Sequence, residues 1–351
     1  MNTIKEYSFS IEHIQSISMK YGIDKQLVQK QIASLVLVAH LKAAGLEFIF
    51  KGGTSLLCLI TPPQRHSLDV DIVVSKETDV EIILNTVAGQ FPFTRFEKEN
   101  RGSTENIIKF HYRFFFNSFI NPQIEENILL DILFEDNPYS QVRFSAIPFD
   151  FILTDKSPIV IVTPTIESIL GDKLTAFAPN TTGIPYKRGE RVMSMEIIKQ
   201  LYDIAQLFDR CENFEEVKST FFKISRIEMI YRKNLSITES DVLNDIYLTS
   251  FIILQRDARD KEFVELLSGI NRLKSYILNK NFHLDYAIIA AGKAAYISRL
   301  LLNQHTNIER FMKPESVSKL KIADGRYLKF NKLHKSNPEA FFYWFKTFEI
   351  N

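Results

Sequence analysis

The 351-residue sequence is poor in cysteine and has almost no net charge. Its two cysteines, Cys58 and Cys211, are too few for a disulfide framework or an all-cysteine zinc site, and neither belongs to a CxxC pair. The 43 lysines and arginines balance 42 aspartates and glutamates, so the whole chain has no charge excess that attracts nucleic acid or a membrane surface. Any polyanionic partner must therefore meet a local group of basic side chains.

Long apolar runs are also missing. No window reaches about 18 uninterrupted apolar residues, the length that spans a bilayer. The first residues, MNTIKEYSFSIEHI, lack the basic start and apolar stretch of a signal peptide. We therefore expect a cytoplasmic protein with no membrane contact.

What the sequence has is enough apolar material for a large core, with 45% hydrophobic and 12% aromatic residues. Its length corresponds to about two domains. Apolar residues recur at three- and four-residue spacing from Asp24 to about Ala44, and Gly45 follows as a C-cap, which predicts an amphipathic helix. Strand patterns occur at residues 46–50, 68–74, 107–116, 128–134 and 158–163.

Helical periodicity dominates after Thr163, with helices predicted from Thr165 to Ala178 and from about Glu190 to Arg210. A loop at residues 179–189, rich in proline and glycine, separates them. The sequence therefore predicts an α+β protein, with a sheet-containing domain at residues 1–164 and a mostly helical domain at residues 165–351.

Two aspartates lie two residues apart in the run LDVDIVV. Because side chains alternate across a strand, Asp69 and Asp71 should project from one face while Val70 and Ile72 point into the core. Like charges held so close repel, and Mg²⁺ with bound phosphate oxygens would compensate them. The alternative is a polar face of an edge strand, since a DxD pattern is short.

A third acidic residue, Asp131, lies inside the apolar run ILLDILF. An unpaired carboxylate in a buried strand is costly to desolvate, so it needs a partner. Beside Asp69 and Asp71 it would complete the ligands of a metal site that clamps the oxygens of an in-line displacement. Alternatively, it caps a backbone group or pairs with an arginine.

The segment Gly52-Gly53-Thr54-Ser55 follows the first predicted strand and opens a short helix that Pro62 and Pro63 must end. Backbone N–H groups at such a turn favour phosphate oxygens. The sequence lacks the GxxxxGK[ST] pattern of a Walker A loop. The turn is a candidate phosphate-binding segment mainly because it lies just before the DxD run.

Taken together, GGTSL, RHSLDVD, an isolated strand aspartate and GDKLTAF resemble the nucleotidyltransferase family that includes the AbiEii and AbiGii abortive-infection toxins. The resemblance extends over about residues 20–210. It implies a DNA-polymerase-β-like nucleotidyltransferase fold, with a mixed sheet flanked by helices. The matching positions are Gly52, Gly53, Thr54 and Ser55, then Arg65, Ser67, Asp69 and Asp71, then Lys173, and finally Asp203 in KQLYDI.

The resemblance implies a Mg²⁺- or Mn²⁺-dependent enzyme that moves a nucleoside monophosphate from an NTP to an acceptor. Asp69, Asp71 and Asp131 bind the metal. The nucleotide is held by the residues Gly52, Gly53, Thr54, Ser55, Arg65, Ser67, Lys173 and Asp203. As a point charge on a helix, Lys173 neutralises the departing pyrophosphate; Asp203 either supports Lys173 or completes the nucleotide pocket.

The resemblance further implies a toxin of a toxin–antitoxin or abortive-infection system, with tRNA as the acceptor and an antitoxin as a possible protein partner. Gln200 departs from the family pattern, which has an acidic residue there. This favours one alternative, an inactive relative that binds a nucleotide or a partner. A separate alternative is a small-molecule nucleotidyltransferase of the antibiotic-modifying type.

Two groups of basic residues lie near these motifs. Lys109, His111 and Arg113 share one face of the strand predicted at residues 107–116, and Lys187, Arg188 and Arg191 lie in or beside the loop. Each group either contacts phosphates of a nucleotide or of RNA, or forms a solvated face.

Overall fold

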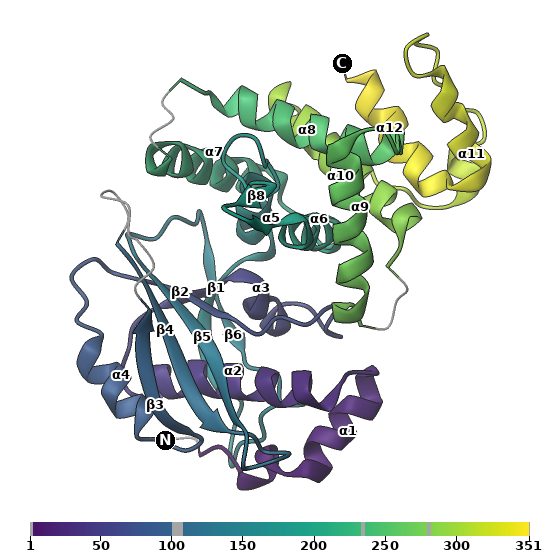
Figure 1. Cartoon of the computed structure of the whole chain (residues 1–351). Helices are drawn as coiled ribbons and strands as arrows, with labels where there is room; N and C mark the ends of the chain where they lie inside the picture. The colour runs from purple at the N-terminus through teal and green to yellow at the C-terminus, as the bar shows by residue number, and fades with distance from the viewer. Residues whose placement is uncertain (1–2, 100–107, 233–235, 279–281, 351) are drawn as a thin grey trace. The chain divides into compact units, whose positions relative to one another are not determined.

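The computed structural model describes residues 3–99, 108–232, 236–278 and 282–350. They form two compact units, one from the described residues of Met1–Thr165 and Tyr276–Lys280 and one from those of Ile166–Ser275 and Asn281–Asn351. A five-stranded sheet belongs to the first unit, and the second is mostly helical (Figure 1). The predicted α+β class is confirmed.

The sheet of the first unit is mixed. Its strand order is β1-β2-β5-β4-β3, in which β2 and β5 are parallel and the other neighbours are antiparallel. Strand β3 was not predicted, because its sequence FTRFEKE is mostly exposed at the edge of the sheet and has few apolar positions. The strands are β1 (Ile49–Lys51), β2 (Val70–Val74), β3 (Phe93–Glu99), β4 (Lys109–Asn117) and β5 (Glu125–Phe134).

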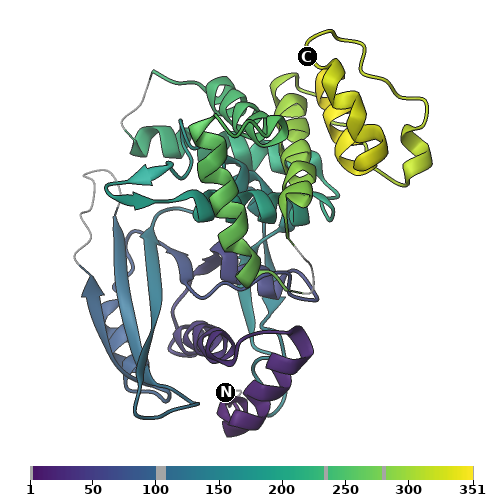
Figure 2. The same ribbon diagram turned by 45° about the vertical axis from the view of Figure 1, so that its right-hand side comes forward.

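Helix α2 (Lys25–Ala43) packs on β2 and β5, and α1 (Ile11–Tyr21) packs on α2 (Figure 2). The predicted helix is confirmed as α2, which begins where the Asp24 side chain accepts a hydrogen bond from the Gln26 N–H at 2.8 Å. Its central positions are buried against the sheet. The other helical segments here are η1 (Glu6–Phe9), α3 (Gly52–Ser55), η2 (Leu56–Cys58) and α4 (Glu81–Ala88).

A two-stranded ribbon completes the first unit. Strand β6 (Val142–Ala146) pairs antiparallel with β7 (Val160–Pro164), and β7 packs against β1. Strand β7 confirms the strand predicted at residues 158–163. Its partner β6 was not predicted, because the strand is exposed at every position except Ser145 and has no continuous apolar run.

One short segment from late in the sequence also belongs to the first unit. The Tyr276 carbonyl accepts a hydrogen bond from the His66 N–H at 2.8 Å, and the Leu278 N–H donates to the Gln64 carbonyl at 2.9 Å. Between them, Arg65 and Ile277 form an antiparallel bridge. The stretch before Asp69 is therefore braced by chain that lies 200 residues away in sequence, which no local pattern predicts.

The second unit is a packed group of helices, in which α5 contacts α6 and α7, and α10 contacts α6, α8 and α12. The helices predicted on either side of the loop are confirmed as α5 and α6. The helices are α5 (Ile166–Ala176), α6 (Ser194–Phe208), α7 (Phe214–Tyr231), α8 (Glu239–Gln255), α9 (Lys261–Leu273), α10 (Leu284–Leu302), α11 (Leu333–Ser336) and α12 (Pro338–Glu349), with η3 (Lys274–Tyr276) at the junction of the units and η4 (Pro314–Val317) and η5 (Leu328–Lys332) near the end.

The loop at residues 179–189 is held to α8 by a buried carboxylate. Asp245 accepts hydrogen bonds from the backbone and side-chain nitrogens of Asn180 at 2.8 and 2.9 Å, and from the Thr181 hydroxyl at 2.9 Å. The loop continues into the hairpin of β8 (Lys187–Arg188) and β9 (Arg191–Val192), whose residues are exposed. Asp245 thus anchors the start of a loop that leads into a hairpin with exposed basic side chains.

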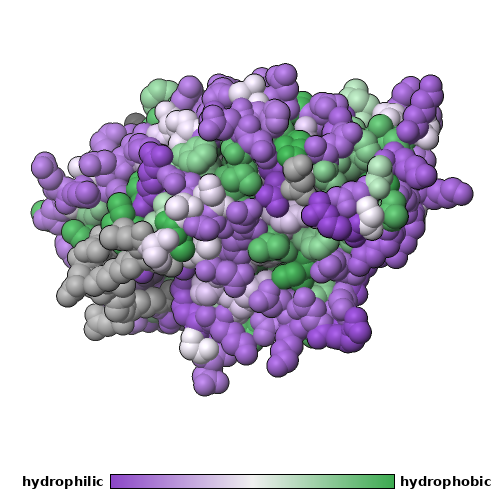
Figure 3. All heavy atoms as spheres, turned by 90° about the horizontal axis from the view of Figure 1, so that it is seen from above, coloured by the Kyte–Doolittle hydropathy of each residue, from purple (hydrophilic) through white to green (hydrophobic). Residues whose placement is uncertain are grey.

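The face seen from above in Figure 3 is mostly hydrophilic, with hydrophobic residues in separate small groups. Within the described part of the chain, no helix has both the length and the apolar character needed to cross a membrane.

Candidate active site

Ionisable residues form a row across all five strands of the sheet. In register, Lys51 of β1 faces Asp71 of β2, Asp71 faces Asp131 of β5, Asp131 faces His111 of β4, and His111 faces Glu99 of β3. Residues in such a row project from the same face of a sheet. Asp71 and Asp131, which the sequence predicts in separate strands, are therefore direct neighbours.

Asp71 is the most perturbed acid of this row. Burial raises the pKa of its carboxyl to about 6. The Lys109 ammonium opposes this shift, and the Asp131 carboxylate adds to it. A buried carboxylate whose ionised form is disfavoured in this way would be stabilised by a bound cation.

Asp131 has two basic partners from β4. Its Oδ2 lies 3.1 Å from the Lys109 Nζ and its Oδ1 lies 2.7 Å from the His111 Nδ1. Burial opposes ionisation of Asp131, but these two neighbours outweigh it and lower the pKa of the carboxyl. The basic stripe on β4 is thus neither simply solvated nor free, because Lys109 and His111 both face this acid.

Asp69 lies just before β2 and is exposed, because the strand begins at Val70. Its backbone is fixed by the Thr54 hydroxyl, which donates to the Asp69 carbonyl at 2.6 Å. The sequence prediction that both aspartates lie inside one strand is therefore correct for Asp71 and wrong for Asp69. Val70 and Ile72 are buried as predicted.

The glycine turn approaches the acids closely. Gly52 has φ +77°, and a Cβ atom there would overlap the Asp71 Oδ2. At Gly53 a Cβ atom would lie 2.5 Å from the Arg65 Nη2 and 2.6 Å from the Ser67 Oγ. Two glycines are needed here because backbone, carboxylate and guanidinium crowd the same small space.

Thr54 and Ser55 are fully buried and their hydroxyls bond to the protein backbone. Thr54 bonds to the Asp69 carbonyl and Ser55 donates to the Gly52 carbonyl at 2.9 Å. Helix α3 has only four residues, so little helix dipole accumulates. These hydroxyls hold the turn to the acidic motif, and the predicted nucleotide contact of this segment rests on its main chain.

Buried polar side chains hold the segment between the glycine turn and Asp69. Arg65 is buried and donates to the His66 carbonyl at 2.8 Å, and the His66 Nδ1 lies 3.0 Å from the Gln31 Oε1 of α2. Ser34, one turn further along α2, donates to the Leu68 carbonyl. Polar residues on the buried face of α2 thus position the motif residues.

Because of His66, the stability of the first unit should vary with pH in the acidic range. Burial lowers the pKa of His66 to about 4 from 6.5, so the unfolded chain takes up a proton that the folded chain excludes. We expect stability to be lost as the pH falls from about 6.5 through about 4. The measurement is the urea unfolding midpoint across that pH range. The midpoint should fall less in the His66→Gln variant than in the wild type.

The exposed His305 offers the matched control for this prediction. His305→Gln should leave the pH dependence of the urea midpoint unchanged. An unaltered acid response in His66→Gln would contradict the assignment of the effect to this buried imidazole.

Within the described residues, no three His, Cys, Asp or Glu side chains converge closely enough to hold a metal ion by themselves. Mg²⁺ is usually bound by one or two carboxylates together with waters and substrate phosphates, so a complete protein cage is not required. The carboxylates of Asp71 and Asp131, which are register neighbours on parallel strands, fit this kind of site, and Gly52 lets the turn come close to Asp71 because it has no side chain.

Lys173 belongs to the second unit and is buried in a polar cluster there. Its Nζ lies 3.1 Å from the Asp203 Oδ2 and donates to the Gln200 Oε1 at 3.0 Å. Asp203 is 1% exposed and Lys173 7%. The structure therefore brings Asp203 to Lys173, which is the first of the two roles considered for Asp203 in the sequence.

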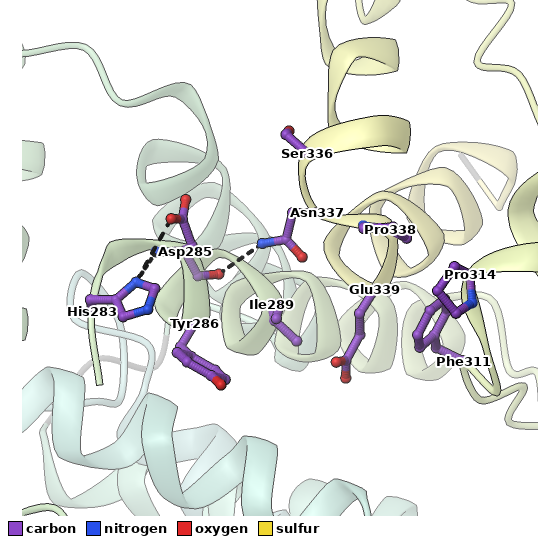
Figure 4. A pocket seen from close by; sticks show the side chains of 10 residues that line it. All are labelled: His283, Asp285, Tyr286, Ile289, Phe311, Pro314, Ser336, Asn337, Pro338 and Glu339. Carbon is purple, nitrogen blue, oxygen red and sulfur yellow. Dashed lines mark hydrogen bonds and ion pairs between the residues drawn. The ribbon is translucent and has the colours of Figure 1, made fainter. Parts of the chain in front are cut away.

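A cavity of about 430 Å³ lies in the second unit, where α10 and α12 begin (Figure 4). The His283 and Tyr286 rings pack edge to face there, and the Asn337 side chain donates to the Asp285 carbonyl at 3.1 Å. Asp285 and Glu339 give it an acidic lining. None of the residues predicted to bind the nucleotide lines this cavity.

Sequence reasoning missed part of the ionisable row. It noted Lys109 and His111 as a basic stripe but did not connect them with Asp131, and it did not single out Lys51 or Glu99. The alternation of cations along residues 109–113 was the available signal. Strand pairing decides which residues are neighbours, and no local sequence pattern predicts it.

The sequence matches a protein-family model described as the nucleotidyl transferase AbiEii toxin of a type IV toxin–antitoxin system. The match covers residues 36–269, more than half of the chain, and includes every predicted site residue from Gly52 to Asp203. No curated protein matches the sequence.

Proposed function

Because the chain belongs to the AbiEii nucleotidyl transferase toxin family, it is a nucleotidyltransferase, and we propose that it transfers a nucleoside monophosphate from an NTP to tRNA with the help of Mg²⁺ or Mn²⁺. Its partner in the type IV system is an antitoxin. The observation that carries the proposal is the pairing of Asp71 with Asp131 on adjacent parallel strands beside the Gly52 turn.

In the proposed reaction, an acceptor hydroxyl oxygen forms a bond to the α-phosphorus of the NTP. The bond from the α-phosphorus to the oxygen bridging to the β-phosphate breaks, pyrophosphate leaves, and the hydroxyl proton passes to solvent. Asp69, Asp71 and Asp131 are the residues that would hold the metal. When bound, the ion neutralises phosphate charge and polarises the reacting groups.

The chain's own residues supply binding and orientation. Main-chain groups of residues 52–55 and the side chains of Arg65 and Ser67 bind the triphosphate. The close approach of Gly53 to the Arg65 Nη2 and the Ser67 Oγ supports this assignment, because it gathers hydrogen-bond donors at one point. Lys173 is proposed to neutralise the departing pyrophosphate, with Asp203 as its supporting acid.

The acceptor is proposed to meet the β8–β9 hairpin through Lys187, Arg188 and Arg191. All three side chains are exposed, and the loop that leads into the hairpin is anchored through Asn180 at Asp245. Glu196 lies 2.8 Å from Arg191, and Glu265 lies 3.8 Å from Lys187. The cations of these two pairs are largely exposed, so phosphate oxygens can compete with the carboxylates for them.

The test is to incubate the full chain with each labelled NTP, Mg²⁺ and total RNA. Label in tRNA is the expected result, and it should disappear with chelator. Label on small molecules instead of RNA would identify an antibiotic-type nucleotidyltransferase. No label with any NTP, under conditions in which the protein is folded, would identify an inactive relative and overturn the proposal.

A further inference from the structure

The two carboxylate oxygens of Asp131 lie beside two different side chains of β4. Its Oδ1 lies 2.7 Å from the His111 Nδ1, and its Oδ2 lies 3.1 Å from the Lys109 Nζ. Lys109 and His111 are two residues apart on β4, so their side chains project from the same face of the sheet. Both oxygens that could coordinate a cation therefore already have a partner in the protein.

The two partners differ in how easily they can move. The His111 side chain is 16% exposed and lies directly opposite Asp131 in the strand register, so its ring is held in place. The Lys109 side chain is 39% exposed, and its ammonium is carried by a flexible four-carbon stem. Lys109 is therefore the partner that can leave Asp131 without disturbing the sheet.

The Lys109 ammonium also acts on Asp71. Burial raises the pKa of Asp71, and Lys109 opposes this rise more strongly than Lys51 does, although Lys51 is the register neighbour of Asp71. One positive charge thus compensates both Asp71 and Asp131, the adjacent acids of β2 and β5. A divalent cation bound there would compensate the same two carboxylates.

We propose that Lys109 is a displaceable counter-ion of Asp71 and Asp131, and that its ammonium must leave Asp131 before a divalent cation binds there. An ammonium and a divalent cation on the same carboxylate repel each other at such short range, so each weakens the binding of the other. This inference rests on the proposed function, since it concerns the acids proposed there as metal ligands. It deepens that function by identifying the residue that sets the affinity of the site for the metal. All three residues belong to the first unit.

The test measures the binding of Mn²⁺ alone to the full chain, by electron paramagnetic resonance of the free ion, with no nucleotide or acceptor present. We expect Lys109→Met to bind Mn²⁺ about tenfold more tightly than the wild type, because the new side chain has a similar length but no competing charge. Lys109→Gln is also neutral and should show the same gain, which keeps the comparison open if Lys109→Met does not fold. Lys109→Arg retains the charge and should bind Mn²⁺ as weakly as the wild type.

Lys98→Met is the matched control for the loss of one positive charge. Lys98 lies on β3 with its side chain 43% exposed, and it faces Tyr112 in register, so it projects from the opposite face of the sheet to His111. This variant should leave the Mn²⁺ affinity unchanged. Adding Asp131→Asn to Lys109→Met should abolish the gain, because the freed carboxylate is the ligand that produces it.

Four results would overturn the inference: an unchanged Mn²⁺ affinity in the two neutral Lys109 variants, an equal gain in Lys109→Arg, an equal gain in Lys98→Met, or a gain that persists with Asp131→Asn. No measurable Mn²⁺ binding by the folded neutral variants would also overturn it, since the two acids would then attract no cation even without their counter-ion. The urea unfolding midpoint of each variant verifies that folded chains are compared.

Failure of the proposed function looks different, because the wild-type chain would then transfer no label from any NTP. The Mn²⁺ measurement contains neither NTP nor acceptor, so its result does not depend on transfer. A wild-type chain that transfers label, together with neutral Lys109 variants that keep the wild-type Mn²⁺ affinity, would refute the role of Lys109 alone.

Discussion

Replacing Asp71 with asparagine is expected to lower nucleotide transfer by at least about a hundredfold, the usual effect of removing one electrostatic contact from a transition state. In the row across the sheet, Asp71 lies between Lys51 on one side and Asp131 on the other. An amide keeps the shape of the carboxyl but lacks its charge, so the change tests charge and not packing.

The same variant should be as stable as the wild type or more stable near neutral pH. Burial raises the pKa of Asp71 to about 6, so above that pH the folded chain holds an ionised carboxylate that is better solvated in the unfolded chain. Asparagine removes this penalty and the repulsion with Asp131. Loss of activity without loss of stability would therefore separate a functional from a structural role.

The measurement is label transfer from NTP together with the urea unfolding midpoint. Asp136→Asn, at an exposed position just after β5, is the matched control and should keep full activity. Substantial turnover by Asp71→Asn would refute its assignment as a metal ligand. A large fall in its stability would show instead that the carboxylate holds the sheet together.

Gly52→Ala is expected to have the second largest effect. The new methyl group would overlap the Asp71 Oδ2, so either the turn or the carboxylate must move. The residue also has φ +77°, which a side chain tolerates poorly. We expect a loss of about 1–3 kcal/mol in the free energy of unfolding and a loss of transfer approaching that of Asp71→Asn.

The Gly45→Ala variant separates the effect of backbone strain from the effect of overlap with Asp71. Gly45 has φ +89°, but a Cβ atom there meets nothing within 4 Å. It should therefore lose stability through backbone strain and keep its activity. If Gly52→Ala were as active as Gly45→Ala, the close approach of the turn to Asp71 would have no part in catalysis.

Much of the fold could be predicted because local patterns were strong. Helix α2 was found from its spacing and from Gly45 after it, and β4, β5 and β7 were found from apolar or alternating runs. Strands β3 and β6 were missed because edge and ribbon strands have exposed residues at most positions. The helical segment that begins at Gly52 ends at Cys58, before Pro62 and Pro63, which we had expected to end it.

The candidate site was predictable as a set of residue types and only partly as an arrangement. Asp71 and Asp131 were identified because carboxylates in apolar strands need partners, and the family resemblance added Lys173 and Asp203. The contacts of Asp131 with Lys109 and His111 were not foreseen. Neither were the hydrogen bonds that use the Thr54 and Ser55 hydroxyls within the protein.

The sequence by itself determined which chemistry is available: acids in or beside strands, a glycine pair and a helical lysine. These follow from side-chain type and from spacing along the chain. The tertiary structure alone decided that Asp71 and Asp131 are neighbours in parallel strands, and that residues 276–278 brace the segment before Asp69. The physical reason is that strand register and long-range pairing depend on how the whole core packs, whereas periodicity and capping depend only on residues a few positions apart.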